Sequence, residues 1–154
     1  MPVPFRLKIV SGGQTGVDRA ALDVALELGL EAGGWAPRGR PAEDGVIPDR
    51  YPMEECASPA YAERTRLNVR DSDATLVLTW GAPEGGTALT IGIAEEMERP
   101  LLVVDLEDAP APALGRAWLA ELAPGVLNVA GPRESSAPGI HGQAADYLKR
   151  LLTS

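Results

Sequence analysis

Five short, nearly uninterrupted apolar runs, each followed by a stretch of helical periodicity, constrain the fold of this chain more than any other feature. Apolar residues on both faces are typical of parallel strands covered by helices on each side. In a strand with one solvent-exposed face, apolar and polar residues alternate instead. The expected strands are Arg6–Ser11, Leu30–Ala36, Ala74–Trp80, Leu101–Leu106 and Val126–Ala130. The second strand is the weakest of these, because Gly33 and Gly34 interrupt it.

Helical periodicity fills the segments between the runs. The expected helices are Val17–Leu28, Tyr61–Val69, Thr87–Met97, Ala113–Leu122 and Gln143–Leu152. In the first of them apolar side chains recur three and four positions apart, and Gly29 supplies a stop. Alternating strand and helix predicts a βαβ series with right-handed crossovers. With 154 residues and no internal repeat or long linker, the whole chain, 1–154, is expected to form a single α/β domain.

The composition argues against several functional classes. The formal net charge is -8 at pH 7, and an acidic surface repels nucleic-acid phosphates, so we expect no nucleic acid as main partner. One cysteine (Cys56) and one histidine (His141) allow neither an internal disulfide nor a Cys/His zinc motif, so no metal site is expected. The N-terminus does not read as a signal peptide, and no apolar stretch reaches about 18 residues, which predicts a cytoplasmic protein with no membrane partner.

The glycine-rich segment Ser11–Arg19 (SGGQTGVDR) is the sharpest candidate for a binding site. It leads from a strand into a helix, whose first N–H groups lack internal partners and carry partial positive charge. Glycines let a ligand approach such a backbone, so the arrangement predicts a phosphate or carboxylate site. Its candidate binding residues are Gly12, Gly13, Gln14, Thr15, Gly16 and Asp18. The alternative is a tight turn in which Gln14 or Thr15 caps the helix and Asp18 only favours its dipole.

Two further loops leave strands in the same way. In Trp80–Thr87, Gly85 and Gly86 offer bare backbone and Thr87 offers a hydroxyl. In Gly131–Ser136, Arg133 and Glu134 are candidate contacts, with a surface Arg–Glu pair as the alternative. In an open parallel sheet such loops meet in a crevice where the strand order reverses, and ligands bind there.

Three more polar residues are candidates. Arg38 follows the second strand and is either an anion contact or a solvated charge. Arg64 and Asn68 are four apart on the Tyr61–Val69 helix and share a face that is either directed at the crevice or exposed. Around Arg38, the proline-rich segment Pro37–Pro59 fits no regular element, and it is either functional or a surface insertion.

Several strings of the sequence resemble one known family over about Lys8–Ile140. They are SGGQTGVDRAALD, GGWAPRGRPAEDGVIPDRYP, RTRLNVRDSDATLVL, GGTALT and LNVAGPRESSAPGI. The chain is similar to the molybdenum cofactor carrier family of the Rossmann-like SLOG superfamily, which includes the "lonely guy" phosphoribohydrolases once described as lysine decarboxylases. The resemblance implies a single-domain Rossmann-like three-layer fold with a mostly parallel sheet of about five strands. It also implies a homo-oligomer, a dimer or a tetramer.

The same resemblance implies a small anionic, nucleotide-like ligand: molybdopterin, the organic part of the molybdenum cofactor, or a nucleotide. The family's two glycine loops fall on Gly12–Asp18 and Gly85–Thr87. One departure concerns catalysis, because Thr90 stands where the phosphoribohydrolases carry a glutamate, and a threonine is no general base at neutral pH. A binding or carrier protein is therefore the preferred hypothesis. The alternatives are a nucleoside-monophosphate phosphoribohydrolase and a nucleotide-sensing regulatory protein.

Overall fold

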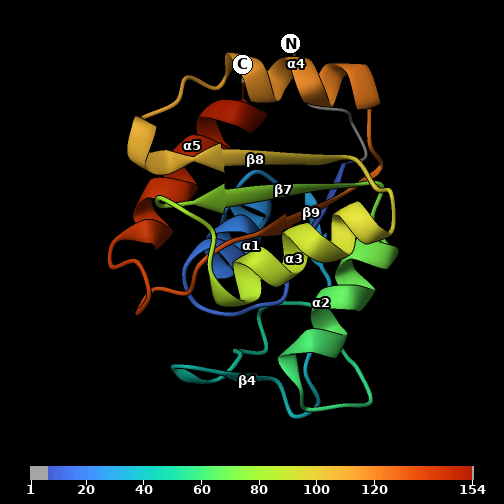
Figure 1. Cartoon of the computed structure of the whole chain (residues 1–154). Helices are drawn as coiled ribbons and strands as arrows, with labels where there is room; N and C mark the ends of the chain where they lie inside the picture. Colours follow the sequence, from blue (N-terminus) through green and yellow to red (C-terminus); the bar gives the residue numbers. More distant parts are fainter. Residues whose placement is uncertain (1–6, 154) are drawn as a thin grey trace.

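The computed structural model describes residues 7–153, and its centre is a five-stranded sheet in which every neighbouring pair is parallel (Figure 1). The strands are β1 (Lys8–Val10), β2 (Glu31–Gly33), β7 (Ala74–Thr79), β8 (Leu101–Asp105) and β9 (Val126–Ala130). All five expected strands are confirmed, although each observed strand but the last is shorter than expected. Arg6, the expected start of the first strand, lies outside the described residues.

The strand order is β2-β1-β9-β7-β8, so the last strand in the chain lies in the middle of the sheet. Counted from β9, the order becomes 3-2-1-4-5, which is the order of the first five strands of a Rossmann sheet. The chain is therefore a Rossmann-like fold whose first strand has moved to the C-terminal end. The strand order reverses between β9 and β7, and this is where a ligand crevice is expected.

Helices cover both faces of the sheet and make three layers (Figure 1). On one face α1 (Val17–Glu27) packs against α5 (Ile140–Leu152), and on the other α2 (Tyr61–Arg70) packs against α3 (Gly85–Glu96). The fifth helix, α4 (Ala113–Leu122), contacts α5 and follows the short 3-10 helix η1 (Leu106–Asp108). Within residues 7–153, none of these helices has the length and apolar character needed to cross a bilayer.

The main hydrophobic core lies between the sheet and the α1–α5 layer. All six residues of β7 are buried, which explains its unbroken apolar run. Val17, Ala21, Val24 and Ala25 of α1 are at most 1% exposed, as the three-and-four spacing predicted. Burying one such valine stabilises the fold by roughly 1.5–3 kcal/mol.

Two helices begin earlier than expected. The helix α3 starts at Gly85 rather than Thr87, and α5 starts at Ile140 rather than Gln143. Glycine is a poor helix former, so the propensity pattern excluded the first turn of α3. The first turn of α5 is stabilised by a side chain of the preceding loop, because Glu134 accepts hydrogen bonds from the N–H groups of Gly139 and His141.

The segment Pro37–Pro59 is more ordered than the sequence indicated. A parallel pair joins β3 (Trp35–Ala36) to β6 (Glu54–Glu55), and an antiparallel hairpin joins β4 (Pro41–Ala42) to β5 (Gly45–Val46). The expectation that no regular element occurs here is therefore wrong. Tertiary contacts supply the order: the Arg40 guanidinium donates to the carbonyl oxygens of Ile47, Pro48, Tyr51 and Met53.

This segment is attached to the main domain by a second apolar cluster. Ile47 and Tyr51 are at most 1% exposed and pack with Leu22 of α1 and with Ala36. The hairpin β4–β5 is consequently held at a fixed place beside the start of α1.

Gly115→Ala in α4 is expected to lower the free energy of unfolding by about 1–3 kcal/mol, because overpacking displaces neighbours. A Cβ atom there would lie 2.7 Å from the Tyr147 hydroxyl and 2.8 Å from Leu151 Cδ1, both on α5. The matched control is Gly142→Ala in α5, where a Cβ meets no heavy atom within 4 Å. That variant is expected to raise the free energy of unfolding by about 0.4–1 kcal/mol. Urea unfolding checks both, and equal effects would contradict the close packing of α4 on α5.

Candidate functional site

The principal candidate site is a cleft at the carboxyl ends of β7 and β9, with a volume of about 280 Å³. Its lining comes from residues 79–80 and 82–87 after β7, residues 131–133 and 136–137 after β9, and Gln14 after β1. The two main loops leave the pair of strands at which the order reverses, so the cleft lies where Rossmann-like proteins bind ligands. The structure thus brings the second and third glycine loops of the sequence together.

The N-terminus of α3 forms one wall of the cleft. A Cβ atom on Gly85 or Gly86 would meet nothing within 4 Å, so the backbone here is open to a ligand. Glu84 precedes the helix without a side-chain capping bond. Within residues 7–153, the N–H groups of Gly85 and Gly86 have no hydrogen-bond acceptor, whereas that of Thr87 is bonded to the Glu84 carbonyl oxygen at 3.1 Å. Two free donors at a helix start, where the dipole is positive, suit an anion.

Side chains complete the cleft. Arg133 is exposed on the loop after β9 and is the one positively charged residue among the described residues of the lining, which also includes Glu84. Thr87 is only 5% exposed and is one of the lining residues. Trp80 is 41% exposed and offers a flat aromatic face. A cleft with an open helix start, a guanidinium and an indole can hold both an anionic group and a planar ring.

The first glycine loop faces protein rather than the cleft. A Cβ on Gly13 would lie 2.7 Å from Met53 Sδ, one on Gly16 would lie 2.3 Å from the Pro132 carbonyl oxygen, and one on Gly12 would overlap the Arg64 guanidinium. These glycines allow close packing of the loop against its neighbours. From this loop only Gln14 lines the cleft. The sequence marked three glycine-rich loops, and the structure shows that the first is packed and the second is open.

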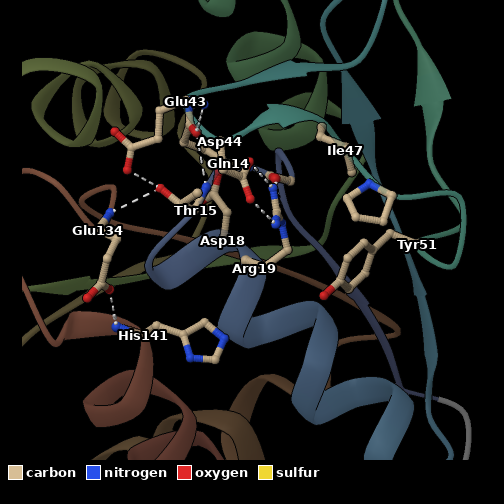
Figure 2. A network of polar contacts seen from close by, with 12 residues as sticks. Gln14, Thr15, Asp18, Arg19, Glu43, Asp44, Ile47, Tyr51, Glu134 and His141 are labelled. Atoms are coloured by element: carbon tan, nitrogen blue, oxygen red, sulfur yellow. Dashed lines mark hydrogen bonds and ion pairs between the residues drawn. The ribbon is translucent and has the colours of Figure 1, made fainter.

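The side chains of this loop form a polar network with the tip of the β4–β5 hairpin (Figure 2). The Gln14 side-chain oxygen accepts from the N–H groups of Thr15 at 3.0 Å and Glu43 at 2.8 Å. The Thr15 hydroxyl donates to the Glu43 carboxylate and accepts from the Glu134 N–H at 3.2 Å. Gln14 and Thr15 therefore connect the loops after β1 and β9 to the hairpin.

An ion pair also anchors the hairpin to α1. The Asp44 carboxylate accepts two hydrogen bonds from the Arg19 guanidinium, at 3.0 and 3.2 Å. Arg19 also donates from Nε to the Gly13 carbonyl oxygen at 3.0 Å. These bonds lower the pKa of the Asp44 carboxyl group below its usual value. No local pattern in the sequence marks Arg19, Glu43 and Asp44, because the partners that join the hairpin to the first loop and α1 are 25 or more residues away.

Asp18 and Arg64 form a buried ion pair that does not line the cleft. Arg64 donates to Asp18 at 3.0 Å, and the side chains of Arg64 and Asp18 are 13% and 6% exposed. Burial raises the pKa of the Asp18 carboxyl group, while Arg64 partly opposes the rise. They line a cavity of about 30 Å³ that also contacts Asn68 and Thr90. This cavity has room for one water molecule, so it does not hold an organic ligand.

The remaining candidates have structural partners. Asn68 exchanges two hydrogen bonds with the Trp35 backbone, at 2.7 and 3.1 Å, and so holds β3. The Glu134 carboxylate caps α5. Arg38 is exposed, does not line the cleft, and belongs to a turn after β3. In the described part of the chain, no three His, Cys, Asp or Glu side chains gather to hold a metal ion.

The three-layer architecture and a cleft at the strand-order reversal define a Rossmann-like α/β protein with its first strand moved to the end. Sequence comparison agrees with this topology, since residues 9–152 match the model of the circularly permutated YpsA SLOG family. The chain belongs to that family.

One solved structure is similar over almost the whole length. It is the crystal structure of a protein from Syntrophus aciditrophicus SB named "Putative molybdenum carrier protein". The identity is 42% and the TM-score is 0.90, with 95% of this chain and 94% of that chain covered. No curated protein matches this chain significantly.

Asp44→Asn is expected to lower the free energy of unfolding at pH 7. It should also make the free energy of unfolding less dependent on pH in the acidic range. The pKa of this carboxyl group is lower in the folded state than the unfolded value of 3.8. Its contribution is therefore present above pH 3.8 and is lost as the pH falls through the folded value. At pH 7 the loss should be about 1 kcal/mol, near the upper end for exposed ion pairs.

Urea unfolding at pH 7 and at pH 3 measures this difference. The control is Asp49→Asn, which removes an equal charge from an exposed position of the same segment that has no ion pair among the described residues. The wild type should lose more stability between the two pH values than Asp44→Asn. An equal loss in both proteins would show that the pair with Arg19 does not stabilise the fold.

Proposed function

We propose that this protein binds a small, nucleotide-like anion in the cleft between the loops after β7 and β9, as a binding or carrier protein. The observation that carries the proposal is the open start of α3, where Gly85 and Gly86 combine free N–H donors with empty space. Arg133 adds a guanidinium that can form paired hydrogen bonds to a phosphate. The cleft volume of about 280 Å³ is close to the lower end of the usual range for ligand sites, roughly 300–1,000 Å³.

The molybdenum cofactor is the candidate cargo that the similar structure suggests, through its name as a carrier protein. The residues of the cleft fit molybdopterin, the organic part of this cofactor. The α3 start and Arg133 suit a terminal phosphate, and Trp80 offers a surface on which a pterin ring can stack. Since no metal-holding group of side chains occurs among residues 7–153, the metal would be held by the cofactor itself.

The residue at position 90 supports binding over hydrolysis of a nucleoside monophosphate, while Glu84 is the carboxylate of the cleft lining that a hydrolase would have to use. Thr90 follows the α3 start at the place expected for a catalytic glutamate, and its hydroxyl donates to the Gly86 carbonyl oxygen at 3.0 Å. Asp18, which lines the same small cavity as Thr90, is paired with Arg64. Release of adenine from AMP during incubation with the protein would contradict the binding function and support hydrolysis.

The protein is further proposed to form a homo-oligomer through the outer surface of α3 and the edge strand β8. Ala88, Leu89 and Gly92 of α3 are exposed, although this helix has apolar residues around most of its circumference. Val103 is 41% exposed on β8, whose outer edge is unpaired within the described sheet. An apolar helix surface beside an open strand edge is typical of contacts between subunits.

Gly86→Val is expected to weaken the binding of AMP at least tenfold, a change of about 1.4 kcal/mol, by filling the space at the α3 start. The fold should remain intact, because a Cβ at Gly86 meets no atom within 4 Å and its φ is not left-handed. The control Gly142→Val places the same side chain in the first turn of α5, outside the cleft. Isothermal titration calorimetry measures both, and unchanged affinity in Gly86→Val would refute this site.

The corresponding substitution in the first loop behaves differently. Gly13→Val must strain the loop, because Gly13 has a φ of +76° and an added Cβ would lie 2.7 Å from Met53 Sδ and 2.8 Å from Ile47 Cδ1. It is therefore a poor probe of the ligand site.

Leu89→Glu is expected to shift the protein to a smaller species in size-exclusion chromatography with light scattering. A charge in the buried centre of an interface is costly to desolvate. Leu114→Glu on α4 is the matched control, because Leu114 is 68% exposed and lies on another helix. Equal masses for the wild type and both variants would rule out the α3 surface as the subunit interface.

A further inference from the structure

The Glu43 carboxylate occupies a ready anion site beside the cleft. Its Oε1 accepts from the Thr15 hydroxyl and, at 3.1 Å, from the Ser135 N–H. Its Oε2 accepts from the Ser135 hydroxyl at 2.5 Å. The three donors come from the loops after β1 and β9, and Figure 2 shows the carboxylate directed at Thr15. Two hydroxyl groups and a backbone N–H are donors that bind phosphate equally well.

The electrostatic surroundings also favour negative charge at this position. Hydrogen bonds from Ser135 and Thr15 hold the pKa of the Glu43 carboxyl group below its usual value, and the charge of Arg133 adds to the effect. Arg133 is also a residue of the cleft wall, as is Ser136, the neighbour of Ser135. The Glu43 position and the cleft are therefore adjacent and share one guanidinium.

The Glu43 side chain can leave without moving the hairpin. Glu43 is exposed, so its carboxylate can rotate into water. The hairpin keeps three other attachments: the Glu43 N–H bond to Gln14, the Asp44–Arg19 ion pair and the buried Ile47. Rotation of one side chain is a fast and inexpensive motion compared with movement of a loop.

We propose that Thr15 and Ser135 form a second anion subsite that Glu43 closes in the free protein, and that a second anionic group of the ligand displaces this carboxylate. The proposal rests on the proposed function for the first anionic group, which binds at the α3 start. It defines the ligand class more closely, as a molecule with two anionic groups, such as a nucleoside diphosphate. Binding at the subsite and docking of Glu43 exclude each other, so each weakens the other by the same factor.

The test uses inorganic phosphate and the backbone amide signal of Ser135 in nuclear magnetic resonance spectra. Glu43→Ala removes the competing carboxylate, and Glu43→Gln removes its charge while keeping the length of the side chain. Asp49→Ala is the matched control, because it removes one negative charge from an exposed position of the same segment. Signal dispersion in the same spectra reports whether each variant is folded.

In Glu43→Ala, phosphate is expected to shift the Ser135 signal at a concentration about tenfold lower than in the wild type, within the usual range of coupling between sites. Asp49→Ala should behave as the wild type, and Glu43→Gln should fall between. Adding Ser135→Ala to Glu43→Ala should abolish the gain, as read from neighbouring amide signals. Equal phosphate titrations in the wild type and Glu43→Ala would overturn the subsite.

A parallel titration with AMP and ADP separates this proposal from the proposed function. The subsite predicts that Glu43→Ala increases the affinity for ADP more than that for AMP, since only ADP carries the second phosphate. Equal gains, or none, while AMP still binds, would overturn the subsite and leave the cleft function standing. Failure of both nucleotides to bind, with a normal phosphate response in Glu43→Ala, would refute nucleotide binding in the cleft but not the subsite.

Discussion

The pairing of β9 with β1 on one side and β7 on the other is the interaction on which the rest of the structure depends. Backbone hydrogen bonds align Val10 with Asn128 and Val77 with Ala130, so the loops after all three strands emerge at the same edge of the sheet. The loops after β1 and β9 are separated by more than 100 positions in the chain. Both the cleft and the polar network around Glu43 follow from this register, because each needs loops from two or more of these strands.

Glycine has two different physical roles around this edge. In the β1 loop glycines allow protein atoms to approach one another, as where Gly16 lies against the Pro132 carbonyl oxygen. At the start of α3 glycines leave space, because nothing lies within 4 Å of a Cβ on Gly85 or Gly86. The first role stabilises the fold and the second gives access to the backbone. The two loops are similar in sequence and differ in what surrounds them.

The acidic composition of the chain is compatible with an anion site because the relevant donors are local. The repulsion from a net charge of -8 weakens with distance, because salt screens it beyond about 10 Å. Backbone N–H groups and hydroxyls act at contact distance, and Glu43 shows that the rim of the cleft already accommodates a carboxylate. The hairpin that carries Glu43 belongs to the proline-rich segment, so the proposed second subsite would make this segment part of the site.

The sequence by itself determined the α/β class, the five sheet strands and all five helices, because apolar periodicity reflects burial directly. It also marked the three loops at the strand ends, since a glycine-rich junction between strand and helix is typical of backbone that another group approaches closely. Only the tertiary structure decided that Gly85 and Gly86 are open while Gly12, Gly13 and Gly16 are packed, because that depends on residues such as Met53 and Arg64 far along the chain. The same holds for Arg19, Glu43 and Asp44, because the sequence does not show which residue a charged side chain pairs with. Only contacts between residues far apart in the chain distinguish a solvated charge from one held in an ion pair or hydrogen bond.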